Sequence, residues 1–395
     1  MTSSLSIPKL SWTVCLISEL TPSLAWDLAC GGPFPDPTML SGDERFMAEA
    51  LREAKGGVGL SSPNPPVGCV LVREGWIIGR GGHTRAGDPH GEIMALRDAE
   101  ARGEDPRGST AYITLEPCCH HGRTPPCTDA LIQAGVGRVV VGVRDSNPRV
   151  DGGGLAILRA QGIGVTEGVL GEACNRFHAP FFKSIRTGLP WVSLKLALGA
   201  DDALGPEDQR TEVTSPEVQA LSHALRRASE AIVVGRRTVE VDDPQLTDRW
   251  PGPVPAQRLF WRVVLDSQGQ ITPSARVWHP IQGQPALRAV TGDPLPLRGV
   301  EDLRLPPDAE GGCSLRHLLH ELGARGVGRI LVEGGPTLAQ RLLAQGWVDE
   351  IHLFRSHLPM HGRVVKLGLP SNQAWVPAAR FKGGEWEIAR IWHNP

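Results

Sequence analysis

His90, Cys118 and Cys127 are residues of the types that bind zinc, and Glu92 lies two positions after the histidine. Catalytic zinc sites commonly take three protein ligands and leave the fourth position to water. Zinc lowers the pKa of that water toward neutrality, so the chemistry also needs a neighbouring group that moves protons. We therefore expect His90, Cys118 and Cys127 to bind Zn²⁺, and Glu92, which is not a ligand, to act as the acid/base.

Local sequence patterns place these residues at the starts of helices. One predicted helix, Glu92–Ala101, begins just after His90, and a second, Thr128–Ala134, begins directly after Cys127. Helix N-termini favour negative charge and lower the pKa of a thiol, so thiolate ligands suit them. Because each helix follows a loop, both first turns can converge on one ion.

The spacing is similar to the H-x-E and P-C-x-x-C signature of zinc-dependent nucleobase deaminases. Here eight residues separate Cys118 from Cys127, where the general motif has two. The longer segment contains Cys119, His120 and Arg123. Its imidazole and guanidinium groups suit an anionic or hydrogen-bonding substrate. A closed structural zinc site, with Cys119 or His120 as the fourth ligand, remains an alternative.

Length and composition limit the class of protein. A chain of 395 residues favours two domains, and 41% hydrophobic residues are enough for folded cores. The net charge of −2, with Lys and Arg scattered along the chain, argues against a nucleic-acid-binding surface. Eight cysteines are too few for a disulfide scaffold, and no apolar run reaches the ~18 residues of a membrane span. We expect a cytoplasmic protein with neither nucleic-acid nor membrane partners.

Residues 1–40 differ from the rest of the chain. The first 38 are apolar and proline-rich with one basic residue, Lys9, and Glu19 and Pro22 interrupt any signal-peptide core. We expect a disordered extension, or a start misassigned upstream of Met39.

Beyond residue 40, the hydrophobic pattern alternates between helices and short strands. In the first half the predicted helices are Glu44–Lys55, Glu92–Ala101, Thr128–Ala134 and Leu155–Ala160, and the strands are Val67–Val72, Trp76–Gly79, Ala111–Leu115 and Arg138–Val143. In the second half the helices are Pro216–Ala228, Leu315–Gly323 and Thr337–Ala344, and the strands are Trp191–Leu198, Ala231–Gly235, Arg262–Asp266, Arg329–Glu333 and Glu350–Phe354. The alternation predicts α/β domains over residues 41–186 and 190–395, the second doubly wound, with Phe182–Pro190 as the linker.

Several segments are specific enough to indicate a family. The chain resembles the bifunctional riboflavin biosynthesis deaminase/reductases in its first half at Ser62-Pro63-Asn64-Pro65-Pro66-Val67-Gly68, Gly82-His83, Pro89-His90-Gly91-Glu92, Glu116-Pro117-Cys118-Cys119-His120-His121-Gly122-Arg123-Thr124-Pro125-Pro126-Cys127 and Val143-Arg144-Asp145-Ser146-Asn147-Pro148. In its second half the similar segments are Leu194-Lys195-Leu196-Ala197, Thr214-Ser215-Pro216, Leu225-Arg226, Gly235 with Thr238, Asp242-Asp243-Pro244-Gln245-Leu246-Thr247, Arg262-Val263-Val264-Leu265-Asp266 and Val332-Glu333-Gly334-Gly335-Pro336-Thr337-Leu338. The long insertion before Cys127 disfavours a general cytidine or guanine deaminase.

The resemblance implies a cytidine-deaminase-like three-layer α/β/α domain followed by a dihydrofolate-reductase-like α/β domain. It also implies hydrolytic deamination of a diaminopyrimidinone that carries a ribosylamino 5′-phosphate. NADPH-dependent reduction of the ribosyl group to a ribityl chain would follow. Zn²⁺ and NADPH are the implied cofactors, and a homodimer is the implied assembly.

The same resemblance implies two further sets of site residues. Substrate-binding residues are expected at Asn64, His83, His121, Arg226, Leu246, Arg249 and Glu333. Cofactor-binding residues are expected at Ala197, Thr238, Asp242, Gly335, Pro336 and Thr337. Asn64 and His83 would contact the pyrimidine or the ribose. Arg226 and Arg249 would lie near the substrate phosphate, which arginine binds through paired donors.

The segment after the strand at Arg329–Glu333 also has a physical interpretation. Two glycines follow Glu333 and let the backbone approach a ligand, and Pro336 suits the first turn of a helix. The N–H groups exposed there can bind a phosphate of NADPH. A Gly-Gly turn alone is a weak signal, and the surrounding segments give it weight.

Four positions depart from the family pattern. Gly91 replaces the usual alanine, at a cost of about 1 kcal/mol of helix propensity. Gly199 replaces a serine after the strand of Lys195, and Arg210 and Glu212 replace the serine and tryptophan of the nicotinamide and substrate pocket. Two alternatives to the bifunctional enzyme therefore stay open. One is a deaminase whose second domain is an inactive scaffold, and the other is a zinc-stabilised protein that binds a nucleotide without catalysis.

Overall fold

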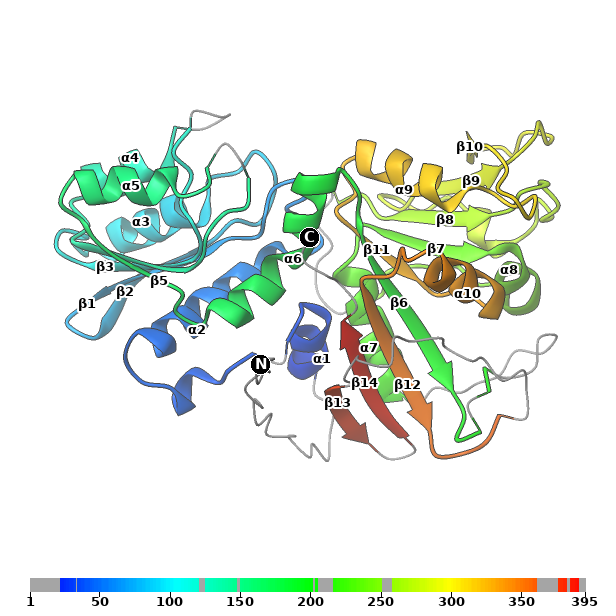
Figure 1. Ribbon diagram of the computed structural model, residues 1–395, viewed down its shortest axis with the longest axis horizontal. Helices are drawn as coiled ribbons and strands as arrows, with labels where there is room; N and C mark the ends of the chain where they lie inside the picture. The colour runs from blue at the N-terminus through cyan, green and yellow to red at the C-terminus, as the bar shows by residue number, and fades with distance from the viewer. Residues whose placement is uncertain are drawn as a thin grey trace, which may run out of the picture.

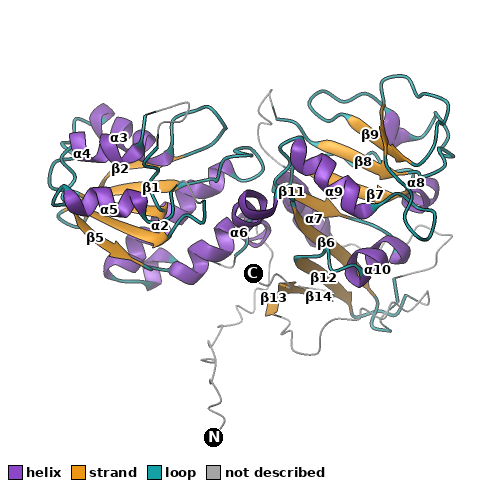
Figure 2. Ribbon diagram, turned by 45° about the horizontal axis from the view of Figure 1, so that its top comes forward, coloured by secondary structure: helices purple, strands orange, loops and turns teal. Residues whose placement is uncertain are grey.

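The computed structural model describes residues 22–32, 34–120, 125–147, 150–201, 203–204, 216–250, 258–360, 376–381 and 384–390. These residues form two lobes, each built around one β-sheet, as Figure 1 shows. The first sheet has five strands and the second has nine. Helices cover both faces of each sheet, so both halves of the chain are layered α/β structures (Figure 2).

The first sheet has the strand order β2-β1-β3-β4-β5. Its strands are β1 (Gly68–Arg73), β2 (Trp76–Gly82), β3 (Thr110–Leu115), β4 (Arg138–Val143) and β5 (Gly164–Glu167). β1 pairs antiparallel with β2 and β3, whereas β3, β4 and β5 run parallel. Parallel neighbours need crossover connections, and the chain supplies them with α4 (Cys127–Gln133) and α5 (Gly153–Ala160).

Side chains of β1 alternate between the two faces of this sheet. Val70 and Val72 share a core with α2 (Gly42–Ala54), and Leu71 shares a core with α3 (Gly91–Ala101). α4 and α5 lie on the α3 face. The domain is therefore the predicted three-layer α/β/α structure.

The second sheet has the order β10-β9-β8-β7-β11-β6-β12-β14-β13. Its strands are β6 (Trp191–Leu198), β7 (Ala231–Gly235), β8 (Trp261–Leu265), β9 (Ala286–Val290), β10 (Glu301–Arg304), β11 (Arg329–Val332), β12 (Glu350–Ser356), β13 (Val376–Phe381) and β14 (Gly384–Arg390). The strands from β10 to β12 run parallel, and β14 and β13 add an antiparallel edge. One face carries α7 (Pro216–Arg227) and α8 (Arg236–Asp242), and the other carries α9 (Leu315–Ala324) and α10 (Pro336–Ala344).

The predicted elements are all present, and β4, β6 and β7 have the predicted bounds. The prediction missed α1, α6, α8, β5, β9, β10, β13 and β14. The missed strand β5 is a four-residue edge strand with partly exposed side chains, so its hydrophobic signal is weak. β9 is buried at every position, and an arginine at its centre, Arg288, hides its apolar pattern.

The segment Phe182–Pro190 is not the predicted linker. α6 (Gly171–Thr187) runs through most of it and ends at Gly188, whose φ of +70° is typical of a left-handed helix cap. Within α6, Nζ of Lys183 donates to Oδ2 of Asp349 in the second lobe at 2.5 Å. The prediction was wrong because Lys183 of this segment is buried in an ion pair and α6 continues to Thr187, so only a short turn joins this helix to β6.

Part of the expected N-terminal extension is a folded element. α1 (Pro22–Ala29) packs against α7, and Leu28 has no exposed surface. Asp27 of this helix pairs with Lys55 of the first lobe, and a backbone carbonyl of α1 accepts a hydrogen bond from Arg329 of the second lobe at 2.8 Å. The expectation of disorder is wrong for this helix, because its apolar residues complete a core that both lobes share.

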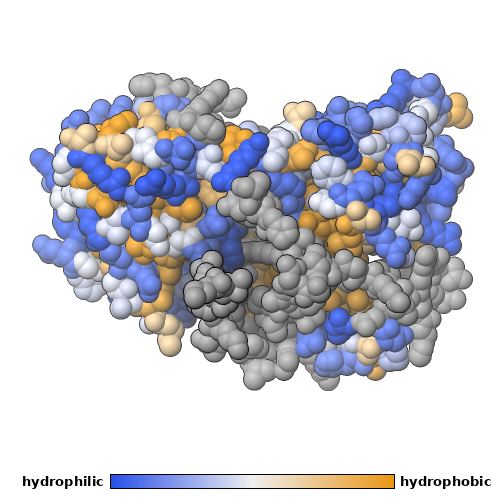
Figure 3. All heavy atoms as spheres, in the orientation of Figure 1, coloured by the Kyte–Doolittle hydropathy of each residue, from blue (hydrophilic) through white to orange (hydrophobic). Residues whose placement is uncertain are grey.

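The surface has no single dominant character. Figure 3 shows hydrophilic residues spread over both lobes in this view, with isolated hydrophobic residues among them. The described exposed hydrophobic residues, such as Trp76 and Leu295, are likewise dispersed along the chain. Among the described helices, none combines the length and hydropathy that crossing a bilayer requires.

The burial of α1 makes a testable contribution to stability. Replacing Leu28 by alanine removes a fully buried side chain and leaves a cavity, which should lower the free energy of unfolding by about 2–5 kcal/mol. Urea unfolding followed by circular dichroism would measure it. Met39→Ala is the control, because this side chain is 83% exposed and should contribute little. Equal stability of the two variants would contradict the packing of α1.

Candidate active sites

The first sheet brings the three predicted metal ligands to one place. His90 is the N-cap residue of α3, and Cys127 is the first residue of α4. Cys118 lies in the loop between β3 and α4. Because α3 and α4 pack on the same face of the sheet, their first turns meet there, as the sequence predicted.

The ligand atoms of these residues all lie within 4.8 Å of one another. Nδ1 of His90 is 3.6 Å from Sγ of Cys118 and 3.3 Å from Sγ of Cys127. One imidazole nitrogen and two sulfurs are a donor set that zinc prefers, and three protein ligands leave its fourth position to water or substrate. Among the described residues neither Cys119 nor His120 joins this cluster, which disfavours the closed structural site.

The environment of Cys118 favours the thiolate. Hydrogen bonding with the Cys127 thiol, followed by hydrogen bonding with His90, lowers the pKa of Cys118 well below that of an ordinary thiol. The backbone N–H of Cys127 also donates to Sγ of Cys118 at 3.3 Å. That N–H belongs to the first turn of α4, so the helix N-terminus stabilises the charged ligand.

Glu92 lies beside this cluster in the first turn of α3 and is 2% exposed. Burial, and then the charge of Cys118, raises the pKa of Glu92 to about 7. Its buried Oε2 atom has no hydrogen-bond partner among the described residues. A buried carboxylate with one oxygen unpartnered, next to a zinc donor set, fits a group that holds and releases a proton of a bound water.

A cavity of about 430 Å³ opens in front of Glu92, and its wall includes Asn64 and His83. Nδ2 of Asn64 is 3.2 Å from Nε2 of His83, and Nδ1 of His83 is 3.1 Å from the carbonyl oxygen of Pro89. Because a carbonyl only accepts, Nδ1 carries the proton and Nε2 accepts from Asn64. Burial lowers the pKa of His83, which keeps the ring neutral. His121 lies outside the described residues.

Two acidic residues of the cavity wall, Glu116 and Asp145, were not predicted from the sequence to belong to the site. Glu116 accepts backbone hydrogen bonds from Asp145 at 3.3 Å, and from the start of α5 at 3.0 to 3.3 Å. These bonds hold the loop after β4, which carries Asp145 and Asn147 into the wall. Burial raises the pKa of Asp145 to about 6. The Glu-Pro-Cys and Asp-x-Asn patterns were the available signals, but residue type alone does not show which carboxylate is buried.

Gly91 has a steric role beyond helix propensity. A Cβ at this position would lie 2.5 Å from the carbonyl oxygen of Val67 and 3.3 Å from that of Gly81. Glycine therefore lets α3 begin directly against the first two strands, next to the metal ligand His90. Only helix propensity was considered from the sequence, because this close contact joins residues far apart in the chain.

The second candidate site lies at the carboxyl ends of β6, β7 and β11, where Ala197, Gly235 and Glu333 lie. Gly335 is the N-cap residue of α10, and Pro336 occupies its first turn, as predicted. A Cβ built on Gly335 would meet no atom within 4 Å, and its φ of −66° is accessible to any residue. The space in front of this helix N-terminus is therefore open, which suits the approach of a phosphate.

The predicted substrate residues of this half differ in their surroundings. Arg226 forms a two-bonded ion pair with Glu333, at 3.0 and 2.8 Å, and donates to the carbonyl of Thr247 at 3.0 Å. Burial opposes ionisation of Glu333, but the charges of Arg226 and Lys195 outweigh it and lower the pKa of Glu333 to about 2. Arg226 thus already has a carboxylate partner, which the sequence prediction did not foresee.

The remaining predicted positions surround these strand ends. The side chain of Leu246 is buried in the core beneath α8, so only its backbone can face a ligand, whereas Arg249 is exposed. Thr238 and Asp242 lie on α8, which begins directly after β7. Gly199 turns the chain after β6, where a Cβ would lie 2.6 Å from the backbone nitrogen of Met360. Arg210 and Glu212 lie outside the described residues.

Comparison with known families assigns the two halves separately. Residues 40–143 match the cytidine and deoxycytidylate deaminase zinc-binding region. Residues 190–358 match the RibD C-terminal domain.

Individual relatives match across both halves. The riboflavin biosynthesis protein RibD of Escherichia coli K12 is 42% identical over 331 residues, covering 79% of this chain and 87% of that protein. RibD of Aquifex aeolicus is 38% identical and covers 79% of this chain and 86% of that protein.

A solved structure matches nearly the whole fold. A diaminohydroxyphosphoribosylaminopyrimidine deaminase/5-amino-6-(5-phosphoribosylamino)uracil reductase of Thermotoga maritima has a TM-score of 0.78 at 33% identity, covering 88% of this chain and 98% of that one. RibD of Acinetobacter baumannii has a TM-score of 0.73 at 29% identity, covering 89% of this chain and 99% of that one.

The metal cluster predicts which cysteine is needed for zinc. Cys118→Ser replaces a thiolate ligand and should abolish stoichiometric zinc binding, which inductively coupled plasma mass spectrometry of the purified protein would measure. Cys119→Ser is the matched control, because its neighbouring thiol lies outside the cluster and should leave about one zinc per chain. Loss of zinc from Cys119→Ser with retention in Cys118→Ser would reverse the assignment.

Proposed function

The chain belongs to the RibD family of riboflavin biosynthesis proteins, and we propose that its two candidate sites carry out the family's two reactions in succession. The protein is a bifunctional enzyme, with a zinc-dependent deaminase domain followed by an NADPH-dependent reductase domain. Its substrates are small phosphoribosylaminopyrimidines. The observation that carries the assignment is the zinc donor set beside the buried carboxylate of Glu92, whose Oε2 atom has no hydrogen-bond partner among the described residues.

In the deaminase domain we assign the metal to His90, Cys118 and Cys127. When bound, zinc lowers the pKa of a water molecule and so supplies the nucleophile for hydrolysis. Glu92 accepts a proton from that water and delivers it to the exocyclic amine, which leaves the ring carbon as ammonia. Burial raises the pKa of Glu92 above that of an ordinary carboxyl, which favours a group that both takes and gives a proton.

We assign the pyrimidine to the cavity that Asn64 and His83 line. Burial lowers the pKa of His83 and keeps its ring neutral, and the bond to Pro89 fixes the orientation of that ring. Asn64 uses one amide hydrogen on His83 and retains its carbonyl oxygen and second hydrogen for a ring edge. The substrate is then a diaminopyrimidinone with a ribosylamino 5′-phosphate.

In the reductase domain we assign NADPH to the carboxyl ends of β6, β7 and β11. The open N-terminus of α10, at Gly335, Pro336 and Thr337, suits a phosphate, and Ala197, Thr238 and Asp242 lie on neighbouring elements. When bound, NADPH supplies the hydride that converts the ribosyl group to ribityl. Arg226 and Glu333 form an ion pair beside these strand ends, and we assign both to binding of the substrate.

We propose further that the enzyme acts in the cytoplasm and as a homodimer. Two of its zinc ligands are thiols, and its described cysteines are unpaired, which fits a reducing compartment. The homodimer is an expectation from the family resemblance, and size-exclusion chromatography with light scattering would test it.

A substitution at Glu92 separates catalysis from metal binding. Glu92→Gln keeps the size of the side chain but removes proton transfer, so ammonia release should fall by about 10²–10⁴-fold while zinc content is unchanged. An ammonia-coupled assay and metal analysis of the same protein would measure both. NADPH oxidation on the deaminated substrate is the internal control and should persist. Wild-type ammonia release by Glu92→Gln would contradict the proposed role.

A substitution at Gly335 tests the cofactor assignment. The fold has room for a methyl group there, so Gly335→Ala should leave thermal stability unchanged. If a phosphate approaches this backbone, the same methyl should raise the KM for NADPH about 10-fold, equivalent to ~1.4 kcal/mol. Steady-state kinetics with varied NADPH would measure the change, with ammonia release as control. An unchanged KM for NADPH would place the cofactor elsewhere.

A further inference from the structure

Residues 58–67 form a loop before β1, and one side of this loop lines the deaminase cavity. Pro63, Asn64 and Pro65 belong to the cavity wall. The backbone N–H of Asn64 donates to the carbonyl of Ser61 at 2.9 Å, and the hydroxyl of Ser61 donates to the carbonyl of Asn64 at 3.0 Å. Because these bonds make the loop a compact unit, a displacement of the loop also displaces Asn64.

The other side of the same loop rests on the reductase domain. The hydroxyl of Ser62 donates to Oε1 of Glu230 at 2.9 Å. The carbonyl of Gly59 accepts from Nε of Arg258 at 3.3 Å. Ser62 directly precedes Pro63, so the contact with the second domain and the wall of the first active site are adjacent in the chain.

Glu230 is itself rigidly held. Its Oε2 accepts from the backbone N–H of Arg329 at 2.6 Å, and its backbone N–H donates to the carbonyl of Arg329 at 3.0 Å. Its carbonyl accepts from the N–H of Trp261 at 2.8 Å. Glu230 therefore belongs to the hydrogen-bonded start of β7, β8 and β11, and its second carboxylate oxygen is directed at Ser62.

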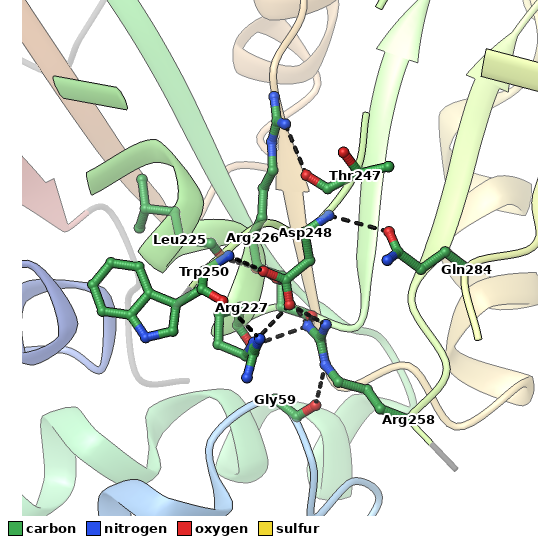
Figure 4. Close-up of polar contacts among 10 residues, drawn as sticks. Gly59, Leu225, Arg226, Arg227, Thr247, Asp248, Trp250, Arg258 and Gln284 are labelled. Atoms are coloured by element: carbon green, nitrogen blue, oxygen red, sulfur yellow. Dashed lines mark hydrogen bonds and ion pairs between the residues drawn. The ribbon is translucent and has the colours of Figure 1, made fainter. Parts of the chain in front are cut away.

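Arg258 is held equally firmly, as Figure 4 shows. It forms an ion pair with Asp248, whose carboxylate also accepts from Nε of Arg227 at 2.6 Å. Its Nη2 atom donates to three backbone carbonyls at 2.9 to 3.1 Å. The carbonyls of Arg226 and Arg227 lie at the end of α7, and that of Ser229 lies two residues beyond it. With these bonds made inside the reductase domain, Nε is left to reach Gly59.

At Gly59 the loop packs directly against the backbone at the end of α7. This residue has a φ of +71°, and a Cβ there would lie 2.1 Å from the carbonyl oxygen of Arg227. Only glycine allows the loop backbone to approach the end of α7 this closely. The loop is therefore seated against the reductase domain, with a hydrogen bond on either side of the close contact.

We propose that Glu230 and Arg258 of the reductase domain are positioning residues for the deaminase, which hold the loop 58–67 so that Asn64 meets the pyrimidine in the correct place. The inference rests on the proposed deaminase function. The zinc ligands and Glu92 lie on other elements, on α3, on α4 and in the loop after β3. Loss of the contact therefore weakens substrate binding more than it slows the chemical step.

The contact is also separate from the reductase site. Glu230 and Arg329 lie at the amino ends of β7 and β11, whereas the proposed cofactor site lies at the opposite, carboxyl ends, at Gly235 and Glu333. A change at Glu230 therefore affects the deaminase without touching groups assigned to NADPH. Because the sites are separate, the reductase activity of each variant serves as the internal control for its deaminase activity.

The test measures both activities of the full-length, zinc-loaded enzyme in variants of the Ser62–Glu230 contact. Glu230→Ala should raise the KM for the deaminase substrate about 10-fold, with kcat for ammonia release within about twofold. Ser62→Ala removes only a hydroxyl and should raise the same KM. The double variant should be no worse than Glu230→Ala alone, because both changes break one bond.

Two controls distinguish positioning from general stability. Glu230→Gln should restore a KM near the wild-type value, because its amide can donate to Ser62 while its carbonyl accepts from Arg329. Asp302→Ala breaks a largely buried ion pair with Arg288 in β9 and β10, far along the sheet, and should leave the deaminase KM unchanged.

The expected result is a rise in deaminase KM in Glu230→Ala and Ser62→Ala, with the KM for NADPH unchanged. A wild-type deaminase KM in both variants would overturn the inference. So would an equal loss of deaminase and reductase activity, which indicates general destabilisation. No ammonia from the zinc-loaded wild-type enzyme would overturn the proposed function itself, and this inference with it.

Discussion

The meeting of two helix N-termini on one face of a five-stranded sheet is the constraint on which the deaminase chemistry depends. α3 and α4 begin at the ends of loops that the sheet brings together, so a histidine and a cysteine far apart in the chain become neighbours. The N-terminus of α4 also stabilises negative charge on the sulfur of Cys118, which accepts a hydrogen bond from the backbone N–H of Cys127. Gly91 is part of this constraint, because in this chain a Cβ at that position would lie 2.5 Å from the carbonyl oxygen of Val67.

The second constraint is the seating of the first domain on the amino ends of the second sheet. α1, α6 and α7 form the joint, and the ion pairs of Lys183 with Asp349 and of Lys55 with Asp27 link elements across it. Burying charged groups is costly unless they are paired, so these contacts persist only while the two domains stay docked. The arrangement explains how a residue of one domain can influence the active site of the other.

The sequence predicted correctly those features that depend on residue type and short spacing along the chain. The zinc ligands, Glu92, the alternating elements and the Gly-Pro start of α10 were all predicted, because hydrophobic period and capping residues are local properties. Besides the missed strands and α8, the errors lie at the joint between domains. The apolar residues of α1 and the charged residues of α6 each have a partner distant in the chain, and neither local pattern shows that partner.

The sequence by itself predicted Glu92 as the acid/base group and determined the metal, the α/β class of both domains and the family, because each follows from residue identity at short spacing. Only the tertiary structure decided which carboxylates are buried, that Arg226 is paired with Glu333, and that Glu230 and Arg258 reach the loop of Asn64. These depend on contacts across long stretches of chain. Burial and pairing set the charge, pKa and position of a side chain, and they exist only once distant segments have packed.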